Sequence, residues 1–323
     1  MGFRLAIVLG LLLAAPAHAE VNTALITDKR PPRALSEFGF FIDMASVIPD
    51  PALAPYEISS PLFTDYADKS RFIFTPAPVE PGLDGPLAFP VGSALIKTFS
   101  YGSVRVETRV MMHKETGWVG YAYVWNDDQS DARLKIAGAD LQMETEYGTI
   151  NYRVPNANQC KACHVGPTKA MQPIGPKIRN LNMGDQLAAL QQAGVLAFLP
   201  DNAPAVPNYS DNSVSLEQRA RAYLDANCAH CHAPGLPADT SGLYLNWEED
   251  RPVHIGIGKK PVAAGRGSGG LLVDIAPGDP DASIMIFRMN STDPGIMMPE
   301  IGRSMVHDEG LSLIRAYIEA LEE

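Results

Sequence analysis

The chemistry of this chain is concentrated in four cysteines that form two pairs, each followed at once by a histidine. The residues are Cys160, Cys163 and His164 in the first group and Cys228, Cys231 and His232 in the second. This is the C-x-x-C-H spacing of a covalently attached c-type haem. The two thiols add across the vinyl groups on one edge of the porphyrin, and the histidine donates an imidazole nitrogen to the iron. The sequence therefore predicts two covalent haem c cofactors.

Two other kinds of site also use C-x-x-C pairs, namely redox disulfides and zinc centres. Neither requires a histidine directly after the second cysteine, and the chain has only 7 histidines in 323 residues. A zinc site made from the four cysteines would leave both of these histidines without a role. The spacing therefore favours haem over a disulfide or zinc.

The first 19 residues have the pattern of a secretory signal peptide. Arg4 precedes an apolar run from Leu5 to Ala15, and Ala17-His18-Ala19 fits a cleavage site of small residues. The run is shorter than the roughly twenty residues that span a membrane. We therefore expect cleavage after Ala19, no membrane span in the mature chain, and a periplasmic location, since bacteria attach haem to apocytochromes outside the cytoplasm.

The charge of the chain restricts its partners. The net charge is −11, whereas a nucleic-acid-binding protein needs a basic face. We expect no nucleic acid as a partner, and the negative charge is compatible with docking to a basic redox partner protein.

Residues 65–155 carry the pattern of short β-strands. Val104–Met112 alternates between two sets of side chains, and Trp118–Trp125 follows a turn as the return strand of a hairpin. Further short strand-like runs lie on either side. The pattern predicts an N-terminal all-β, sandwich-like domain over residues 20–155.

The remainder of the chain carries helical signals. Ser215 and Gln218 form a capping-box pattern at the start of a helix over Leu216–Asn227, which ends at Cys228, and a second amphipathic helix is expected over about Val306–Leu321. We therefore expect an α+β multidomain chain in which the haem regions are mainly α-helical. Its parts are residues 1–19 (signal peptide), 20–155 (β-rich domain), 156–212 (first haem segment) and 213–323 (second haem domain).

Residues 213–323 resemble a class I cytochrome c domain, which has a helix ending in C-x-x-C-H, a Met-Pro loop and a closing helix. From about residue 35, the chain is similar to bacterial diheme c-type cytochromes with a β-rich segment before the first motif. The resemblance implies that Cys228 and Cys231 form thioethers and that His232 is the proximal ligand of the second iron. It also implies that Met298, which precedes Pro299, is the distal ligand, with its neighbour Met297 as the alternative.

The first motif departs from that pattern, because no Met-Pro loop follows it before the second domain. The resemblance implies thioethers at Cys160 and Cys163 and a proximal His164, whose ring would donate to the carbonyl of the Gly175-Pro176 pair. The sixth ligand of the first iron stays open. The candidates are Met171, Met183 and His113, or an open position.

Haem propionates need cationic partners, and a glycine-rich stretch of the second domain offers three. They are Lys259, Lys260 and Arg266. The alternative is that these side chains are simply exposed to solvent.

A haem with histidine and methionine ligands is coordinatively saturated and carries one electron at a time. We therefore expect an electron carrier. The alternative is a diheme peroxidase-like or other oxidoreductase that uses an open or labile position at the first haem. No catalytic residue is identifiable, because His113 and Glu115, the two candidate bases, stand in no recognisable motif. A third possibility is a binding module in which the β-rich region recognises a partner or polymer.

Overall fold

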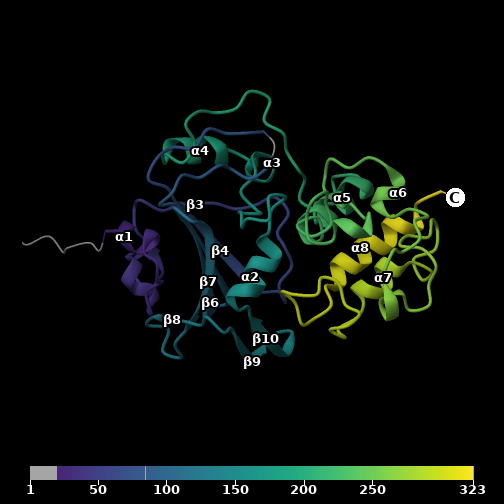
Figure 1. Ribbon diagram of the computed structural model, residues 1–323, viewed down its shortest axis with the longest axis horizontal. Coiled ribbons are helices and arrows are strands. Elements are labelled where there is room, and N and C mark those ends of the chain that lie inside the picture. Colours follow the sequence, from purple (N-terminus) through teal and green to yellow (C-terminus); the bar gives the residue numbers. More distant parts are fainter. Residues whose placement is uncertain (1–19, 84, 323) are drawn as a thin grey trace, which may run out of the picture.

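The computed structural model describes residues 20–83 and 85–322, so the predicted signal peptide lies outside the described residues. Figure 1 shows a sheet-based unit and a helical unit side by side. The helical unit is formed by the C-terminal third of the chain, and the helix that carries the first cysteine pair lies on the sheet-based unit.

The sheet-based unit contains one six-stranded antiparallel sheet in which every strand pairs with the next along the chain. Its strands are β3 (Ala54–Pro55), β4 (Asp68–Phe74), β5 (Ala94–Tyr101), β6 (Val104–Lys114), β7 (Gly117–Trp125) and β8 (Ala132–Leu134). The hairpin expected over residues 104–125 is present as β6 and β7, with Lys114 paired to Gly117 at the turn. Two small hairpins flank the sheet. They are β1 (Phe41–Asp43) with β2 (Ile48–Pro49), and β9 (Ala139–Thr145) with β10 (Gly148–Val154).

Each face of the sheet is covered by a different part of the chain. On one face, the segment with α1 (Thr23–Thr27) and the 3-10 helix η1 (Leu35–Phe38) packs its apolar side chains against Val110 and Tyr123. On the other face, α3 (Ile178–Leu181) and α4 (Gln186–Gln192) pack against Leu95 and Met111. The helix α2 (Ala157–His164), which carries the first cysteine pair, lies on this second face against β7.

The structure contradicts the expected fold, which was an all-β sandwich followed by mainly α-helical haem regions. Helix and strand each account for 23% of the residues that the structure describes. Within residues 20–83 and 85–322, no second large sheet faces the six-stranded one. The lead-in segment and the segment after the first motif cover the sheet, and they do so as short helices and loops. Residues 156–322 are mostly irregular, and three of their short helices end at a left-handed glycine, namely Gly242, Gly256 and Gly269.

The C-terminal unit packs its helices around one apolar core that includes Leu224, Ile314 and Ile318. The helices are α5 (Leu216–Asn227), α6 (Pro252–Ile255), α7 (Ile284–Met289), α8 (Asp308–Glu319) and the short 3-10 helices η2 (Asp239–Ser241) and η3 (Gly265–Ser268). The helix expected to end at Cys228 is confirmed as α5, and the closing helix, α8, is shorter at both ends than expected. Gly310 allows α8 to approach α5, since a β-carbon there would lie 2.3 Å from the hydroxyl of Tyr223.

No helix among the described residues combines the length and the apolar composition that crossing a bilayer requires.

Candidate functional site

The second cysteine pair lies at the end of α5. The helix begins at a cap in which the N–H of Gln218 donates to Oγ of Ser215 at 3.3 Å, and Cys228 is the first residue beyond its C-terminus. The chain then turns, so that the N–H of His232 donates to the carbonyl of Cys228 at 2.9 Å. Both sulfur-bearing residues are half-buried. The turn therefore presents two thiols and an imidazole within five residues, as haem attachment requires.

The ring of His232 is oriented through its Nδ1 atom. This atom lies 3.4 Å from Oγ of Ser241, whose hydroxyl donates to the carbonyl of Ala238 at 2.7 Å. Oγ of Ser241 is therefore placed to accept a hydrogen bond from the Nδ1–H group, which leaves Nε2 as the nitrogen available to a metal. Burial, followed by the charge of Arg288, lowers the pKa of His232 to about 4, so the ring is in the neutral form that metals bind.

The loop with the two candidate methionines is clamped by one arginine. Nη2 of Arg303 donates to the carbonyl of Met298 at 2.9 Å and to that of Ser291 at 2.8 Å, while Nη1 donates to the carbonyl of Met305 at 2.8 Å. Met297 is only 4% exposed, whereas Met298 is half-buried. Met297 therefore fills the core, and Met298 has the more accessible thioether. The assignment of Met298 as the distal ligand stays a prediction.

The first cysteine pair lies on a short helix with no apolar core of its own. The helix α2 starts with a reciprocal cap, in which Asn156 and Gln159 exchange backbone-to-side-chain hydrogen bonds of 2.9 and 3.0 Å. None of its residues is fully buried. It rests on β7 instead, where a β-carbon at Gly120 would lie 3.5 Å from Cβ of Cys160. The sheet therefore positions the first pair.

The ring of His164 is held by a carbonyl other than the expected one. Its Nδ1 atom lies 3.0 Å from the carbonyl of Gln172, whereas the carbonyl of Gly175 accepts from Nδ2 of Asn180 and from the N–H of Lys177. The expectation of a Gly-Pro acceptor is therefore wrong. The chain bends back sooner after the motif, because Gln172 also pairs its N–H with the carbonyl of His164. Burial lowers the pKa of His164 to about 4, so this ring is also neutral.

All four cysteines are free thiols, and burial is the first cause of a raised pKa at each. The pKa rises to about 12 for Cys228 and for Cys231. At Cys160 and Cys163, the positive charge of Arg109 opposes the rise. The thiols are therefore protonated at neutral pH.

The two motifs lie next to each other across the contact between the units. The Cys163 thiol is close enough to contribute, after burial, to the raised pKa of Cys231. Just beyond the motifs, Nζ of Lys169 donates to the carbonyl of Gly235 at 2.9 Å, and Pro167 packs against the same glycine. Segments that are separated by more than sixty residues in the chain therefore place the two cysteine pairs side by side.

Buried charges hold this contact in place. Nη2 of Arg179, from α3, forms an ion pair of 2.8 Å with Oδ1 of Asp225, from α5, and both side chains are 6% exposed. Asp65 accepts from the N–H groups of Ser304 and Met305 at 2.8 and 2.9 Å. Both contacts cross between the units and fix the second motif relative to the sheet.

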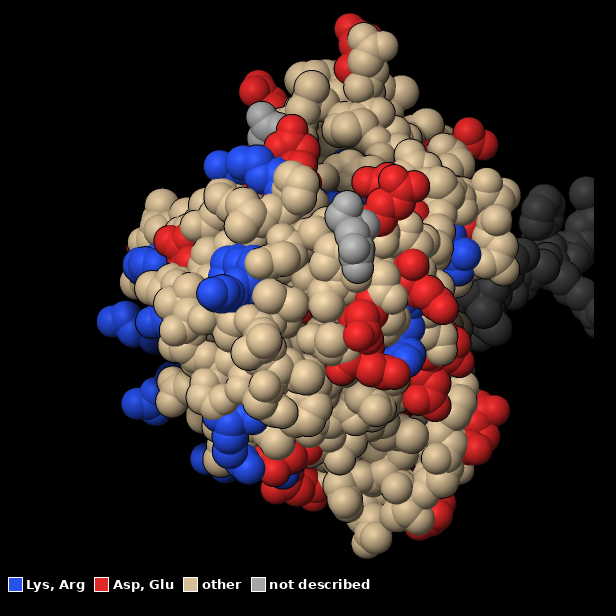
Figure 2. All heavy atoms as spheres, turned by 90° about the vertical axis from the view of Figure 1, so that its right-hand side faces the viewer, with Lys and Arg blue, Asp and Glu red and all other residues tan. Residues whose placement is uncertain are grey.

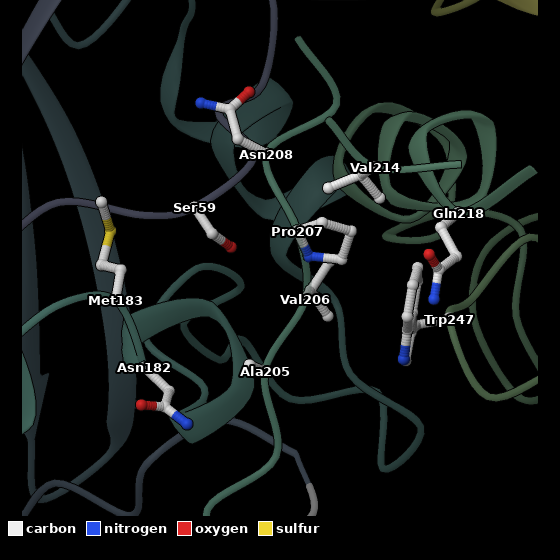
Figure 3. A pocket seen from close by; sticks show the side chains of 10 residues that line it. All are labelled: Ser59, Asn182, Met183, Ala205, Val206, Pro207, Asn208, Val214, Gln218 and Trp247. Carbon is white, nitrogen blue, oxygen red and sulfur yellow. The ribbon is translucent and has the colours of Figure 1, made fainter. Parts of the chain in front are cut away.

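The three candidate sixth ligands of the first iron lie in different places. The terminal methyl of Met171 lies over Gly120, beside Cys160 on the helix side of the sheet. Met183 is 38% exposed and lines a separate hollow between the units, together with Trp247 (Figure 3). His113 has Nδ1 2.7 Å from the carbonyl of Phe89 and stacks on the neighbouring indole of the hairpin. The contact with Phe89 engages Nδ1 of His113 and leaves its Nε2 atom available to a metal. The identity of the sixth ligand stays a prediction.

Two of the three cations expected to neutralise propionates have carboxylate partners, whereas the third, Lys260, is exposed. Arg266 forms a two-pronged ion pair with Asp293 at 2.7 and 3.2 Å, and Lys259 pairs with Asp274 at 3.3 Å. Both pairs lie within the second unit. These ion pairs indicate that Arg266 and Lys259 stabilise loops within the second unit.

Sequence reasoning missed the residues that position the two motifs. Gly120, Gln172, Ser241 and Arg303 lie far from any cysteine motif or stand in no pattern of their own. Another missed residue, Arg109, did leave a signal in the sequence. Glu107 and Arg109 occupy alternate positions of a strand, so both charges lie on the same face of the sheet. Charges on the covered face of a sheet indicate that something polar lies against it.

The residues present fit two haem c groups, because each site combines two free thiols with a neutral imidazole whose Nδ1 atom is already engaged. Within the described ranges, no three His, Cys, Asp or Glu side chains converge to hold a metal ion on their own. No protein-family model, no curated protein and no solved structure matches this chain.

Proposed function

We propose that the chain holds two covalent haem c groups and carries single electrons in the periplasm, exchanging them with a redox partner protein. A haem of this kind supplies a one-electron couple when it is bound. The observation that carries the proposal is the placement of the two cysteine pairs, which come together across the contact between the units. A pair of isolated sites would need no such contact.

The roles of the residues follow from their surroundings. Cys160 and Cys163 would hold one group, and Cys228 and Cys231 the other. His164 and His232 would each offer Nε2 to an iron, since their Nδ1 atoms face Gln172 and Ser241.

The rest of each site serves electron carriage more than chemistry on a substrate. Met298 would complete the second site, held by the arginine clamp on its loop. The ion pair between Arg179 and Asp225 keeps the two sites at one separation. A fixed separation favours fast exchange, because the rate of electron transfer falls steeply with distance.

The surface supports a charged partner. Figure 2 shows the face at the C-terminal end of the molecule, where acidic side chains gather across the middle and basic side chains line one edge. With a net charge of −11, the chain would attract a basic partner over a distance of about one Debye length. Electron exchange with such a partner is expected to slow as the ionic strength rises. The periplasmic location rests on the signal-peptide pattern of residues 1–19.

The test is a spectrum of the purified mature protein, by absorption and electron paramagnetic resonance, before and after carbon monoxide. Two low-spin haems that do not bind carbon monoxide would support the carrier. One high-spin haem that binds carbon monoxide would contradict it and favour the oxidoreductase, with the chemistry placed at the Cys160–His164 site. Variants in which His164 or His232 is replaced by alanine would assign each signal to its site.

A further inference from the structure

A row of four cationic side chains crosses the sheet on the face that carries the first motif. Lys69 and Arg71 come from β4, Lys97 from β5 and Arg109 from β6. Arg71 is paired in register with Lys97, and Lys97 with Arg109. Like charges directly opposite each other on neighbouring strands are destabilising. This row therefore needs negative charge from elsewhere.

The carboxylates of the chain neutralise only part of this positive charge. Arg109 pairs with the buried Glu107, and Arg71 forms a 2.7 Å ion pair with Glu57, whose side chain is 58% exposed. Lys69 donates to a backbone carbonyl at 2.7 Å. The four cations thus have two carboxylates as ion-pair partners, one of them largely in water, while Asp65 and Asp68 act on Lys69 without forming an ion pair with it.

Lys97 is the centre of the imbalance. Lys97 is half-buried, and within residues 20–83 and 85–322 no oxygen accepts a hydrogen bond from its ammonium group, which lies 4.9 Å from the centre of the Phe99 ring. Contact with an aromatic ring compensates for little of the hydration that a lysine loses. Burial and the charges of Arg109, Arg71 and Lys69 hold its pKa well below the usual range. The same causes, with Arg71 as the main charge, lower the pKa of Lys69 to about 8.

The row lies beside the first cysteine pair. Arg109 acts on the pKa of both Cys160 and Cys163, and Lys97 acts on that of Cys163 and of His164. The helix α2 rests on the neighbouring strand, β7, at Gly120. A ligand that touched Lys97 would therefore lie next to the first haem site.

We propose that Lys97, supported by Lys69, Arg71 and Arg109, forms an oxyanion-binding site on the sheet beside the first motif. A carboxylate or another oxyanion offers two or more acceptor oxygens, which suit an ammonium and a guanidinium placed on adjacent strands. Two sources share this chemistry. One is a small free oxyanion, and the other is a propionate of the haem attached at Cys160 and Cys163, which rests on the proposed function.

The experiment uses the purified holoprotein with inorganic sulfate as the probe, at constant ionic strength maintained with chloride. Binding is measured by calorimetric titration, and stability by thermal unfolding without sulfate. The variants are Lys97→Met, which removes the charge at similar volume, and Lys97→Arg, which keeps it. Lys135→Met is the matched control, because Lys135 is exposed on the same unit.

A free oxyanion is the ligand if the wild type binds sulfate, Lys97→Met binds it at least tenfold more weakly, and Lys135→Met is unchanged. A haem carboxylate is the ligand if sulfate does not bind and Lys97→Met, but not Lys97→Arg, lowers the unfolding midpoint. Removing one partner of an ion pair is destabilising, whereas removing an unpaired cation that stands opposite two other cations relieves repulsion and is stabilising. Absence of sulfate binding with an equal or higher midpoint in Lys97→Met would overturn the proposal. Haem content, measured on the same samples, tests the proposed function separately.

Discussion

The two cysteine pairs share a spacing but lie in different surroundings. The second pair belongs to a self-contained unit, in which α5, α7 and α8 share one apolar core and a single arginine holds the methionine loop. The first pair lies on α2, which buries none of its own residues and rests on a sheet formed by strands far away in sequence. The charges differ as well, since four cations stand beside the first pair.

This difference shows how one motif is accommodated in two ways. A site within its own core needs only local elements, so short helices and a loop are enough. A site on a sheet takes its walls and its electrostatic field from other segments. We therefore expect changes in the sheet to affect the first of the two proposed haems and changes in the C-terminal core to affect the second, with the contact between the units affecting both.

The largest effect is expected from the ion pair that joins the two regions. Asp225→Ala would remove the buried partner of Arg179 and leave it paired only with Glu248, whose side chain is 55% exposed; breaking a buried pair costs about 3–5 kcal/mol. We expect a lower denaturation midpoint and slower electron exchange between the haems. Chemical denaturation and rapid-reduction kinetics would measure the two effects.

The matched control for that variant is Asp281→Ala, which removes an ion pair with Arg315 of the same 2.8 Å length on the surface. An exposed pair contributes about 0–1 kcal/mol. If both variants lost the same stability, the contact between the units would not depend on the buried pair.

Substitutions at the two methionines of the second region are expected to have different effects, one mainly on stability and the other mainly on the haem spectrum. Met297→Ala should cost about 2–4 kcal/mol, because it leaves a cavity in a packed core, and should keep the near-infrared band of a methionine-ligated ferric haem. Met298→Ala should abolish that band with a smaller loss of stability. Loss of the band in Met297→Ala would instead make Met297 the ligand.

A smaller effect is expected from acid in the second region. Hydrogen bonds from Arg251, followed by the backbone and His254, lower the pKa of Glu249 to about 2. A carboxyl group whose pKa is lower in the folded state stabilises the fold above its unfolded pKa, about 4.3, and loses that contribution as the pH falls toward 2.

Glu249→Gln should therefore cost about 1.5 kcal/mol at pH 7, as for a hydrogen bond to a charged group, and should flatten stability between pH 4.3 and 2. Denaturation series at pH 7, 4 and 3 would measure this. An unchanged slope in the variant would show that the acid sensitivity arises elsewhere.

The smallest effects are expected from the helix caps of the two motifs. Asn156→Ala removes the reciprocal cap of α2, and Ser215→Ala removes the cap of α5, at about 1 kcal/mol each. Because α2 has no core of its own, its variant should also alter the absorption spectrum of the first haem. The Ser215 variant should leave the spectrum of the second haem unchanged. A changed second spectrum with an unchanged first spectrum would show that the second site, and not the first, depends on its helix cap.

The contrast also explains what the sequence could and could not predict. The helix over Leu216–Asn227 and the hairpin of β6 and β7 carry local signals, namely a capping residue and an alternating pattern, and both are present. The predicted β-sandwich was wrong because the sequence of the strands does not specify which segments cover the sheet. A bulge in the pairing of β5 with β6 also changes the faces, so that Val106 packs in a different core from Val110.

The residues of the candidate site also fall into a predictable group and an unpredictable group. Adjacent residues in the chain define the cysteines and histidines, so sequence reasoning reaches them. Gly120, Lys97 and Asp225 matter because of long-range pairing across strands and between units, which spacing does not encode. The acceptor of His164 was misplaced by three residues, because the exact bend after the motif depends on a backbone pair between His164 and Gln172.

The most direct test of the account is the mass of the intact, denatured mature protein together with its haem content by the pyridine haemochrome method. Two haem groups are expected to stay attached after denaturation, and one after Cys160 and Cys163, or Cys228 and Cys231, are replaced by alanine. A mass equal to that of the unmodified polypeptide, or one that retains a single haem in the wild type, would contradict it.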